Sequence, residues 1–355
     1  EDVKRIGSAN DDFLSAPRTT LLPEAFEEML LKMFGTPNGL ETLIHMDKPK
    51  HLKLRKVTTE WFLPRSIDKL ELEIRALAKE FVDKMFTLGD ECDFVRDIAM
   101  YYPLRVILSI LGLPRDAEET MLTLTQELFG GQDPTLQRGE DMESGLGVLS
   151  DFGDFFNHVI EEKKLNPTDD LASVLANATV DGEPMNTLDQ MSYFIITATA
   201  GHDTASAAIS GGMKALIDHP EQRDILRANP ILDMNAAKEM IRWTSPVRHM
   251  VRTATSDMEI RGKDIKAGDN LALWYPSANR DPDVFNNPNI LDFKRDSKSQ
   301  LAFGHGAHIC LGQHLAVLEV SCFFRELLPR IKDIAMNGDP KWVQAIFVGG
   351  LKSLP

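Results

Sequence analysis

The segment Phe303-Gly304-His305-Gly306-Ala307-His308-Ile309-Cys310-Leu311-Gly312 is the most informative stretch of this 355-residue sequence. Gly304 and Gly306 permit a tight, partly left-handed turn, after which Cys310 stands where we expect a helix to begin. The partial positive charge and free N–H groups of a helix N-terminus favour a thiolate over a thiol. Because Gly312 lacks a side chain, a large flat group has room close to the backbone. Such a thiolate suits axial ligation of haem iron, where its electron density favours O–O cleavage.

Two other interpretations of this segment stay open. A lone cysteine in a glycine-rich turn is most often a buried structural residue. Zinc is the second alternative, as in a zinc hydrolase, because His305, His308 and Cys310 are clustered. Zinc sites usually combine a ligand pair such as C-x-x-C with a distant second pair, and this sequence has no such pairs. Haem is therefore the favoured interpretation once the motifs below are added.

The composition is that of an ordinary globular protein. Hydrophobic residues make up 43% and charged residues 26% of the chain, which excludes wholesale disorder. The formal net charge of −15 disfavours nucleic acid or an anionic membrane as a partner. No apolar run approaches the roughly 18 residues of a membrane span, and the start of the chain does not resemble a signal peptide. Three cysteines are too few for a disulfide framework, so we expect a reducing, cytoplasmic setting.

The hydrophobic periodicity predicts a mainly α-helical fold with a small β region. Helical patterns cover residues 67–85, 104–113, 116–129, 146–164, 187–216 and 310–331, and strand patterns cover residues 251–257, 259–265 and 270–275. Residues 276–299 have no regular pattern and are expected to form a packed loop. No repeat or change of composition divides the chain, which predicts a single domain over residues 1–355.

A second motif, Ala200-Gly201-His202-Asp203-Thr204, lies in the middle of the most apolar predicted helix. Glycine inside a helix costs about 1 kcal/mol relative to alanine, so Gly201 needs a reason. If the Thr204 hydroxyl bonds a backbone carbonyl one turn back, it would widen or kink the helix. That would open a pocket for a small ligand such as O₂, with Asp203 and Thr204 placed to relay protons. A plain helix–helix contact at Gly201, with Asp203 in solvent, is equally compatible.

Glu239 and Arg242 form a third motif, because residues three apart on a helix face each other and pair. Such pairs are common on solvated helices and are weak evidence alone.

A fourth motif is the basic segment from Lys48 to Lys56, where five of nine residues are Lys or Arg and none is acidic. This is usually a solvated helix face. However, His51 and Arg55 lie one helical turn apart and are placed to grip a carboxylate such as a haem propionate. The lysines are suited to an acidic electron-donor protein, since charge complementarity raises the association rate.

In this order, the four segments resemble the cytochrome P450 family of haem-thiolate monooxygenases. Phe303, Gly306, Cys310 and Gly312 match the family's Phe-x-x-Gly-x-x-x-Cys-x-Gly pattern. The resemblance implies the P450 fold, a triangular, helix-rich prism with haem b between the long central helix and the helix of the Cys loop. It also implies that Cys310 binds the iron. The implied cofactor contacts are His51, Arg55, Ala200, Arg252, Phe303, Gly304, His308 and Gly312.

The same resemblance implies the activity, in which one oxygen atom of O₂ is inserted into a small lipophilic substrate. A terpenoid, an alkylaromatic or a steroid-like compound is expected, because the sequence looks closest to the bacterial branch that hydroxylates α-terpineol. Electrons would come from a 2Fe–2S ferredoxin and its NAD(P)H-dependent reductase, docking near Lys48 to Lys56. Val247, Met250 and Val251 are expected to line the substrate pocket. A haem-binding sensor or carrier remains an alternative, whereas Asp203 and Thr204 disfavour a peroxide-driven enzyme.

The chain departs from the family pattern in two places. It begins where relatives have completed an N-terminal helix and a strand pair, so we expect these elements to be missing. In addition, Ile290 occupies a position where the family often has an arginine that completes a triad with the Glu239–Arg242 pair. Arg280 and Arg295 are the candidates to replace that arginine.

Overall fold

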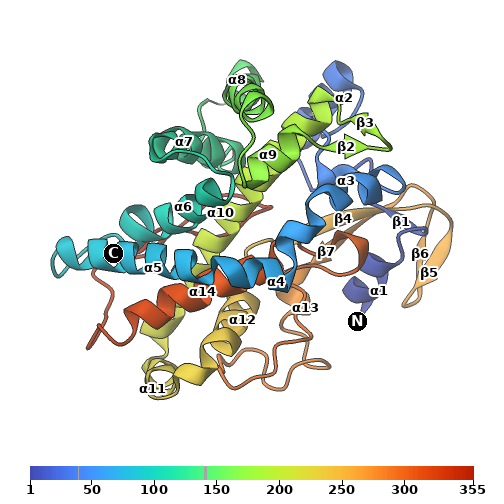
Figure 1. Ribbon diagram of the computed structural model, residues 1–355. Helices are drawn as coiled ribbons and strands as arrows, with labels where there is room; N and C mark the ends of the chain where they lie inside the picture. Colours follow the sequence, from blue (N-terminus) through green and yellow to red (C-terminus); the bar gives the residue numbers. More distant parts are fainter. Residues whose placement is uncertain (39, 140–141) are drawn as a thin grey trace.

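Most of the chain is helical (Figure 1). The computed structural model describes residues 1–38, 40–139 and 142–355. The helices are α1 (Asp2–Ser8), α2 (Glu24–Phe34), α3 (Lys50–Thr59), α4 (Pro64–Ile67), α5 (Glu71–Thr87), α6 (Tyr101–Ile110), α7 (Glu118–Phe129), α8 (Met142–Leu165), α9 (Leu171–Ala176), α10 (Thr187–Asp218), α11 (Pro220–Ala228), α12 (Asp233–Thr244), α13 (Tyr275–Ala278) and α14 (Gln313–Leu327). The strands are β1 (Phe13–Leu14), β2 (Thr179–Val180), β3 (Glu183–Pro184), β4 (His249–Ala254), β5 (Met258–Ile260), β6 (Lys263–Ile265), β7 (Asn270–Trp274), β8 (Lys341–Trp342) and β9 (Leu351–Ser353). Strands β1 and β4 to β7 lie together on one side of the molecule (Figure 1).

Helix α10 is the central element, and α6, α12 and α14 pack against it. The side chain of Asn186 caps its first turn by accepting a hydrogen bond from the backbone N–H of Asp189. Pro220 ends the helical run, because it follows the last turn and begins α11. Phe194 and Ile209 are inaccessible to solvent, as expected of a helix buried on most sides.

The helix predictions are confirmed in kind, with ends that differ by up to four residues in the helices predicted at residues 104–113, 116–129, 146–164 and 187–216. Two other predicted helices differ more. The segment predicted at residues 67–85 divides into α4 and α5, because a short 3₁₀ turn at Asp68–Leu70 redirects the chain. The segment predicted at residues 310–331 is α14, which begins only at Gln313. The prediction that a helix begins at Cys310 is therefore wrong by three residues.

The small sheet has the strand order β1–β4–β7, and both pairings are antiparallel. Arg252 of β4 lies opposite Leu271 of β7 and is almost fully buried. The hairpin predicted over residues 259–265 is β5 paired with β6, turning at Arg261 and Gly262, which both have positive φ. The sheet therefore holds Arg252 in the interior of the protein.

Residues 276–299 form the packed loop that the sequence predicts, apart from the short helix α13 at its start. Phe285, Leu291 and Phe293 are at most 3% exposed, so the loop is part of the core and not a linker. The guanidinium of Arg295 donates to three backbone carbonyls of the same loop, which fixes its course without regular structure.

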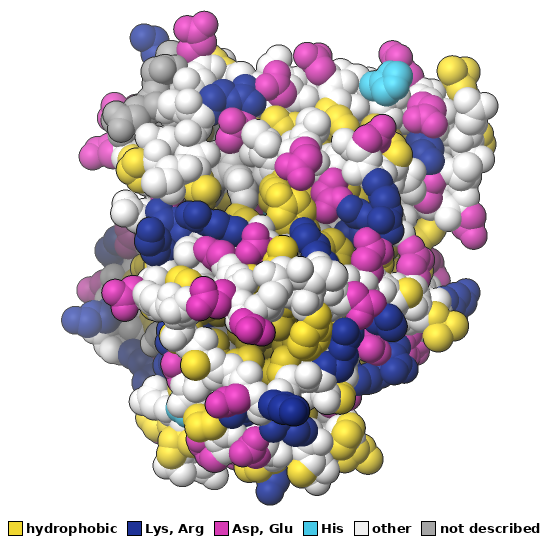
Figure 2. Space-filling view, turned by 90° about the vertical axis from the view of Figure 1, so that its left-hand side faces the viewer, with side chains coloured by type: hydrophobic (Ala, Val, Ile, Leu, Met, Phe, Trp, Pro, Cys, Tyr) yellow, Lys and Arg dark blue, Asp and Glu magenta, His cyan; other side chains and the backbone are white. Residues whose placement is uncertain are grey.

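On the face drawn in Figure 2, acidic and basic side chains are interspersed and do not separate into single-sign areas. Elsewhere in the chain, charged side chains pair between elements, for example Arg75 of α5 with Glu326 of α14, and Arg330 with Asp83 of α5. Within the described residues, no helix has the length and apolar character needed to cross a membrane.

Candidate functional site

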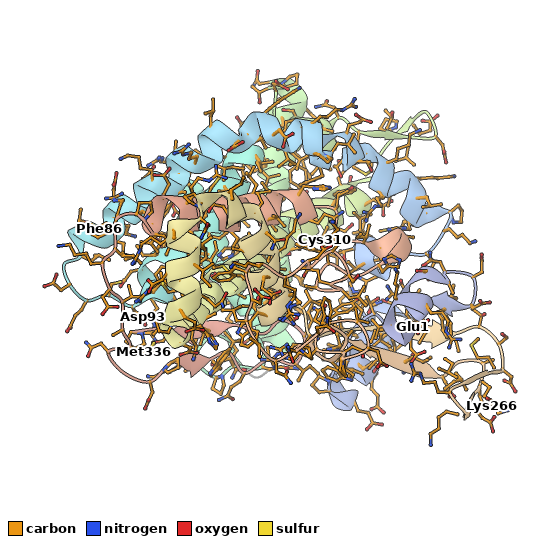
Figure 3. The ribbon with its side chains drawn as sticks, turned by 90° about the horizontal axis from the view of Figure 1, so that it is seen from below. Glu1, Phe86, Asp93, Lys266, Cys310 and Met336 are labelled. Atoms are coloured by element: carbon orange, nitrogen blue, oxygen red, sulfur yellow. The ribbon has the colours of Figure 1, made fainter. Side chains whose placement is uncertain are left out.

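The Cys loop lies near the middle of the molecule and leads directly into α14 (Figure 3). Gly304 and Gly306 have φ angles of 70° and 80°, which confirms the left-handed turn predicted from their spacing. The backbone N–H of Cys310 donates to the carbonyl oxygen of Phe303 at 2.8 Å and closes the turn. A Cβ on Gly306 would lie 2.4 Å from the carbonyl oxygen of Gly7, so a side chain there is excluded.

The sulfur of Cys310 is set by this loop and not by a helix N-terminus, since α14 begins three residues later. Burial raises the pKa of the Cys310 thiol, while the backbone N–H of Gly312 and the charge of Arg55 act in the opposite direction. An added Cβ on Gly312 would meet nothing within 4 Å, so the space beside the sulfur is open. A flat ligand therefore has the room that the sequence predicts.

Four cationic or basic side chains that are distant in sequence converge beside this loop: His51 and Arg55 from α3, Arg252 from β4, and His308 from the loop itself. The rings of His51 and His308 stack with centroids 4.0 Å apart. Arg55 donates to the carbonyl oxygen of Ile309 at 2.7 Å. Burial, together with the neighbouring His51 and Arg252, lowers the pKa of His308 to about 2.

This cationic cluster lacks the anion that its charge requires. Among the described residues, neither Arg55 nor Arg252 forms an ion pair, and His51 Nε2 and Arg252 Nε are buried without a hydrogen-bond partner. The nearest acidic group, Asp47, accepts hydrogen bonds from the backbone N–H groups of Ser15 and Ala16, both at 2.9 Å. Buried polar groups are rarely left unpaired, so the geometry fits an anionic ligand such as the propionates of haem.

The central motif of α10 has one exposed position, Ala200. Thr204 Oγ1 donates to the carbonyl oxygen of Ala200 at 2.9 Å, the back-bond that the sequence predicts. The helix nevertheless continues without a break from Thr187 to Asp218, so the predicted kink does not interrupt it. Ala200 is exposed although it lies near the middle of a mostly buried helix. An open space therefore borders this face of α10.

His202 and Asp203 differ sharply in how well their polar atoms are satisfied. His202 Nε2 lies 2.7 Å from the carbonyl oxygen of Met100, and Nδ1 lies 3.1 Å from Thr125 Oγ1, so both ring nitrogens are paired. Asp203 Oδ2 is buried with no partner. Burial raises the pKa of the Asp203 carboxyl, and His202 opposes this shift. The alternative of an Asp203 in open solvent is therefore wrong.

The zinc alternative is also wrong. In the part of the chain that the structure describes, no group of three or more His, Cys, Asp or Glu side chains is arranged to hold a metal ion. The reason is local, because the His308 ring stacks on His51 and its Nε2 lies 3.0 Å from Ser15 Oγ, while the Cys310 backbone turns back to Phe303.

The three residues expected to line a substrate pocket have different environments. Val247 and Met250 are partly accessible, whereas Val251 is only 1% exposed. Val251 therefore does not face an open space. Val247 forms an isolated bridge with Val348, which brings the C-terminal segment to the same place.

The Glu239–Arg242 pair is fully buried and bidentate, with Nε–Oε2 and Nη2–Oε1 distances of 2.7 and 2.8 Å. Arg295 is its third partner, since its Nε lies 3.0 Å from Glu239 Oε1. Arg280 instead donates to the carbonyl oxygen of Trp243, and Ile290 is 57% exposed. Of the two candidates named from sequence, the structure selects Arg295.

Most of the basic segment is neutralised within the protein. Lys48 pairs with Asp11, Lys50 with Glu41 and Asp189, and Lys53 with Asp181. Arg55 points inward to the Cys loop. Lys56 is exposed and is the lysine of the segment for which the described residues provide no ion-pair partner.

Sequence reasoning did not identify Ser15, Asp47 or His45 as parts of this site. Ser15 Oγ contacts His308, Asp47 fixes the backbone at Ser15, and His45 is close enough to His308 to lower its pKa. These residues lie in irregular segments with no periodic pattern. The one usable signal was the nearness of His45 and Asp47 to the basic segment in the chain.

Comparisons with known proteins agree with this arrangement. The sequence profile of the family described as Cytochrome P450 matches residues 23–342. The chain is 40% identical over 364 residues to Cytochrome P450-terp of Pseudomonas sp, covering 100% of this chain and 85% of that protein. It is 34% identical over 312 residues to linalool 8-monooxygenase of Pseudomonas putida, covering 88% and 76%. Crystalline CYP108D1 from Novosphingobium aromaticivorans superposes with a TM-score of 0.91 at 43% identity, covering 99% of this chain and 84% of that one.

Proposed function

Because this chain belongs to the cytochrome P450 family, we propose that it inserts one oxygen atom of O₂ into a small terpenoid. It is a P450 monooxygenase, and its cofactor is haem b. The observation that carries the proposal is the cluster of Arg55, Arg252, His51 and His308 beside the Cys310 loop, which lacks an anion among the described residues. When bound, haem supplies the activation of O₂ that no protein side chain provides.

The residues of the Cys loop and the cationic cluster divide the work of holding the cofactor. Cys310 would bind the iron through its sulfur, beside the space left open at Gly312. His51, Arg55, Arg252 and His308 would bind the propionates. In support, His51 Nε2 and Arg252 Nε have no other partner. Phe303 and Gly304 would fix the position of the Cys310 sulfur, because the backbone hydrogen bond between Cys310 and Phe303 closes the turn.

Asp203 and Thr204 are the proposed proton relay. A carboxyl with a raised pKa holds a proton at neutral pH more readily than an exposed one does. The Thr204 hydroxyl borders the exposed Ala200, to whose carbonyl it is bonded. A proton held at Asp203 would therefore pass to a ligand over Ala200 through this hydroxyl.

A matched pair of variants tests the relay. Thr204→Ala should retain haem but lower the product formed per electron consumed several-fold, because the hydroxyl is lost at the open face. Thr199→Ala is the control, since Thr199 makes the same back-bond, to Ile195, but is buried. Equal coupling in the two variants would exclude the relay role of Thr204.

The substrate class rests on the surroundings of the site and on the relatives. Val247 and Met250 are apolar and partly accessible, which favours a lipophilic substrate. Two similar proteins are Cytochrome P450-terp and linalool 8-monooxygenase. We therefore favour a terpenoid over an alkylaromatic or steroid-like substrate.

A 2Fe–2S ferredoxin with its NAD(P)H-dependent reductase is the proposed electron source, docking near Lys48 to Lys56. Arg55 supports this location, because it joins α3 to the Cys loop at Ile309. A donor seated on α3 would therefore be close to Cys310. Lys56 is the cation best placed to meet an acidic partner, since the other lysines are already paired.

The substrate experiment uses the haem-loaded protein and a panel of linalool, α-terpineol, an alkylbenzene and a steroid. We expect the two monoterpenols to shift the haem from low to high spin and to incorporate ¹⁸O from ¹⁸O₂. If only the alkylbenzene or the steroid does so, the activity stands and the terpenoid class is wrong. If no thiolate-bound haem is present, the whole proposal fails.

A further inference from the structure

Asp133 is a carboxylate with no accessible surface in a loop that is otherwise largely exposed. It lies between α7 and α8, and its neighbours Gln132 and Thr135 are both exposed. A buried charge in such a loop requires a partner, since an unpaired one is strongly unfavourable. The partner comes from the other end of the chain.

The C-terminal segment supplies every long-range contact of this carboxylate. Lys352 Nζ lies 2.9 and 2.8 Å from the two carboxylate oxygens, and the backbone N–H of Gln344 donates to Oδ2 at 3.0 Å. Gln132 adds a contact by accepting from the backbone N–H of Ile346 at 3.1 Å. Burial alone would raise the pKa of Asp133, but the hydrogen bonds from Lys352 and Gln344 hold it well below its usual range.

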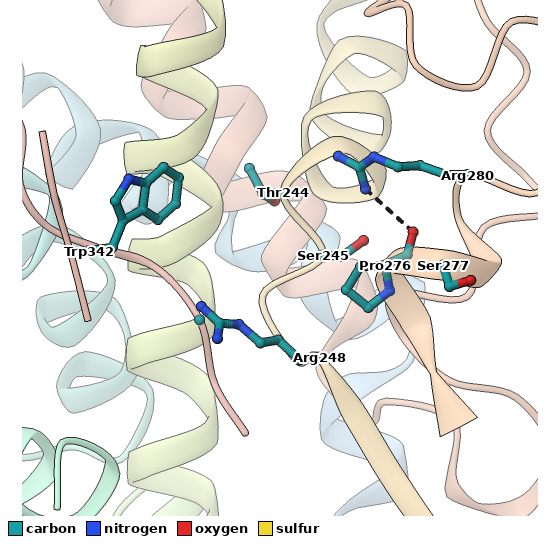
Figure 4. Close-up of a pocket in the computed structure, with 8 residues that line it drawn as sticks. Thr244, Ser245, Arg248, Pro276, Ser277, Arg280 and Trp342 are labelled. Atoms are coloured by element: carbon teal, nitrogen blue, oxygen red, sulfur yellow. Dashed lines mark hydrogen bonds between the residues drawn. The ribbon is translucent and has the colours of Figure 1, made fainter. Parts of the chain in front are cut away.

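The opposite side of the C-terminal segment is fixed to the residues that precede β4. The backbone N–H of Arg248 donates to the carbonyl oxygen of Phe347 at 2.9 Å. The Arg248 side chain extends toward the segment that carries Trp342 (Figure 4). Its guanidinium lies against Gly349 and donates to the carbonyl oxygen of Ala345 at 2.7 Å. Val247, proposed above to line the substrate pocket, bridges to Val348. Residues 344–349 are thus held between the Asp133 loop and the wall that carries Val247.

The C-terminal segment also contacts α10, through Gly350 and Ala207. A Cβ on Gly350 would lie 2.9 Å from the Cβ of Ala207, so the two backbones are close. Ala207 follows Ala200 by seven residues, or about two helical turns, which places both on one face of the helix. The C-terminal segment therefore packs on the same side of α10 as Ala200, about two turns further along the helix.

We propose that Asp133 is a positioning residue for the substrate, because it fixes the part of the C-terminal segment that forms one wall of the distal pocket. This inference rests on the proposed function, which makes the space over Ala200 the substrate site. Asp133 touches neither substrate nor cofactor. It acts through Gln344 and Lys352, which hold residues 345–348 against Val247.

The test compares Asp133→Asn with Asp170→Asn. Asp170 forms a similarly buried ion pair with Lys163, but between α8 and α9. Two readouts are taken on the protein as purified. The first is hydrogen exchange in the peptide covering residues 342–350, which does not depend on haem chemistry. The second is the pair of dissociation constants for imidazole and 4-phenylimidazole, because both bind iron but only the phenyl group needs the distal wall.

We expect Asp133→Asn to speed exchange in residues 342–350 and to weaken 4-phenylimidazole binding about tenfold, with imidazole binding unchanged. Lys352→Met should have the same two effects as Asp133→Asn. Asp133→Glu, which keeps the charge, should bind 4-phenylimidazole more tightly than Asp133→Asn does. Asp170→Asn should lower stability without either effect. Unchanged 4-phenylimidazole binding in both Asp133→Asn and Lys352→Met would overturn the proposal. A wild-type protein without thiolate-bound haem would instead overturn the proposed function, while the exchange result would still test the anchoring.

Discussion

Two regions of this molecule bury clustered charge, and they differ in whether the cluster is complete. Around Glu239, every charge has its partner: Arg242 and Arg295 bind the carboxylate, and Ser297 Oγ donates to it at 2.8 Å. Beside Cys310, Arg55 and Arg252 converge with His51 and His308 without an anion among the described residues, and two nitrogens of this cluster are unpaired. The first cluster needs nothing from outside, whereas the second requires a ligand.

The comparison separates a structural role from a binding role by physical means. Removing one member of a complete buried cluster leaves its partner unpaired, which destabilises the fold. Removing one cation from an incomplete cluster relieves repulsion in the unliganded protein and weakens the liganded one. In the apoprotein, a substitution is therefore expected to lower the free energy of unfolding in the first region and not to lower it in the second.

The largest effect is expected for Glu239→Gln. The change leaves Arg242 and Arg295 buried without their carboxylate and should lower the free energy of unfolding by about 3–5 kcal/mol. Glu60→Gln is the control, because Glu60 pairs with Arg65 on the surface and should matter by at most about 1 kcal/mol. Urea denaturation measures both. Equal urea midpoints for Glu239→Gln and Glu60→Gln would contradict the structural role of the buried cluster.

The second effect concerns Arg252→Gln in the incomplete cluster. Loss of one charge-assisted contact should weaken haem retention about 10- to 100-fold, measured by haem transfer to an acceptor protein. The apoprotein should be no less stable than wild type, because the change removes a buried charge that has no ion pair among the described residues, against the loss of one hydrogen bond from Arg252 Nη1 to the carbonyl oxygen of Val251. Arg261→Gln, at an exposed arginine, is the control. A less stable apoprotein with normal haem retention would assign Arg252 a structural role.

The third effect is the pH dependence of the stability that Asp133 contributes. Asp133 forms a complete, largely buried ion pair with Lys352, like the cluster around Glu239. Its pKa is depressed in the folded state, so its contribution is present above the unfolded pKa of about 3.9 and is lost as pH falls toward the folded value. The difference in unfolding free energy between wild type and Asp133→Asn should therefore shrink by about 1 kcal/mol from about pH 6 to about pH 3. A difference that grows as the pH falls would contradict the depressed pKa.

Sequence patterns predicted those parts of the site that are local or periodic. The Gly304–Gly306 turn and the Thr204 back-bond follow from short-range geometry, and both are present. The buried course of α10 follows from its apolar period. No local or periodic pattern in the sequence predicts that His51, Arg252 and His308 lie together. That prediction depended on the family resemblance.

Other features depend on tertiary contacts that no local pattern encodes. The start of α14 at Gln313 reflects the hydrogen bond that ties Cys310 back to Phe303. The choice of Arg295 over Arg280 depends on how the irregular loop folds onto α12. The ion pair of Asp133 and Lys352 joins residues 219 positions apart, and neither residue stands out in the sequence.

The central claim is that Cys310 is the thiolate ligand of the haem that the cationic cluster holds, and the spectrum of the reduced, CO-bound protein tests it most directly. Wild type should show the red-shifted Soret band of thiolate ligation. Cys310→Ser should lose that band while remaining folded, because Cys310 is a free cysteine whose loop is closed by backbone hydrogen bonds. A red-shifted band that survives in Cys310→Ser, or that is absent from haem-loaded wild type, would contradict the account.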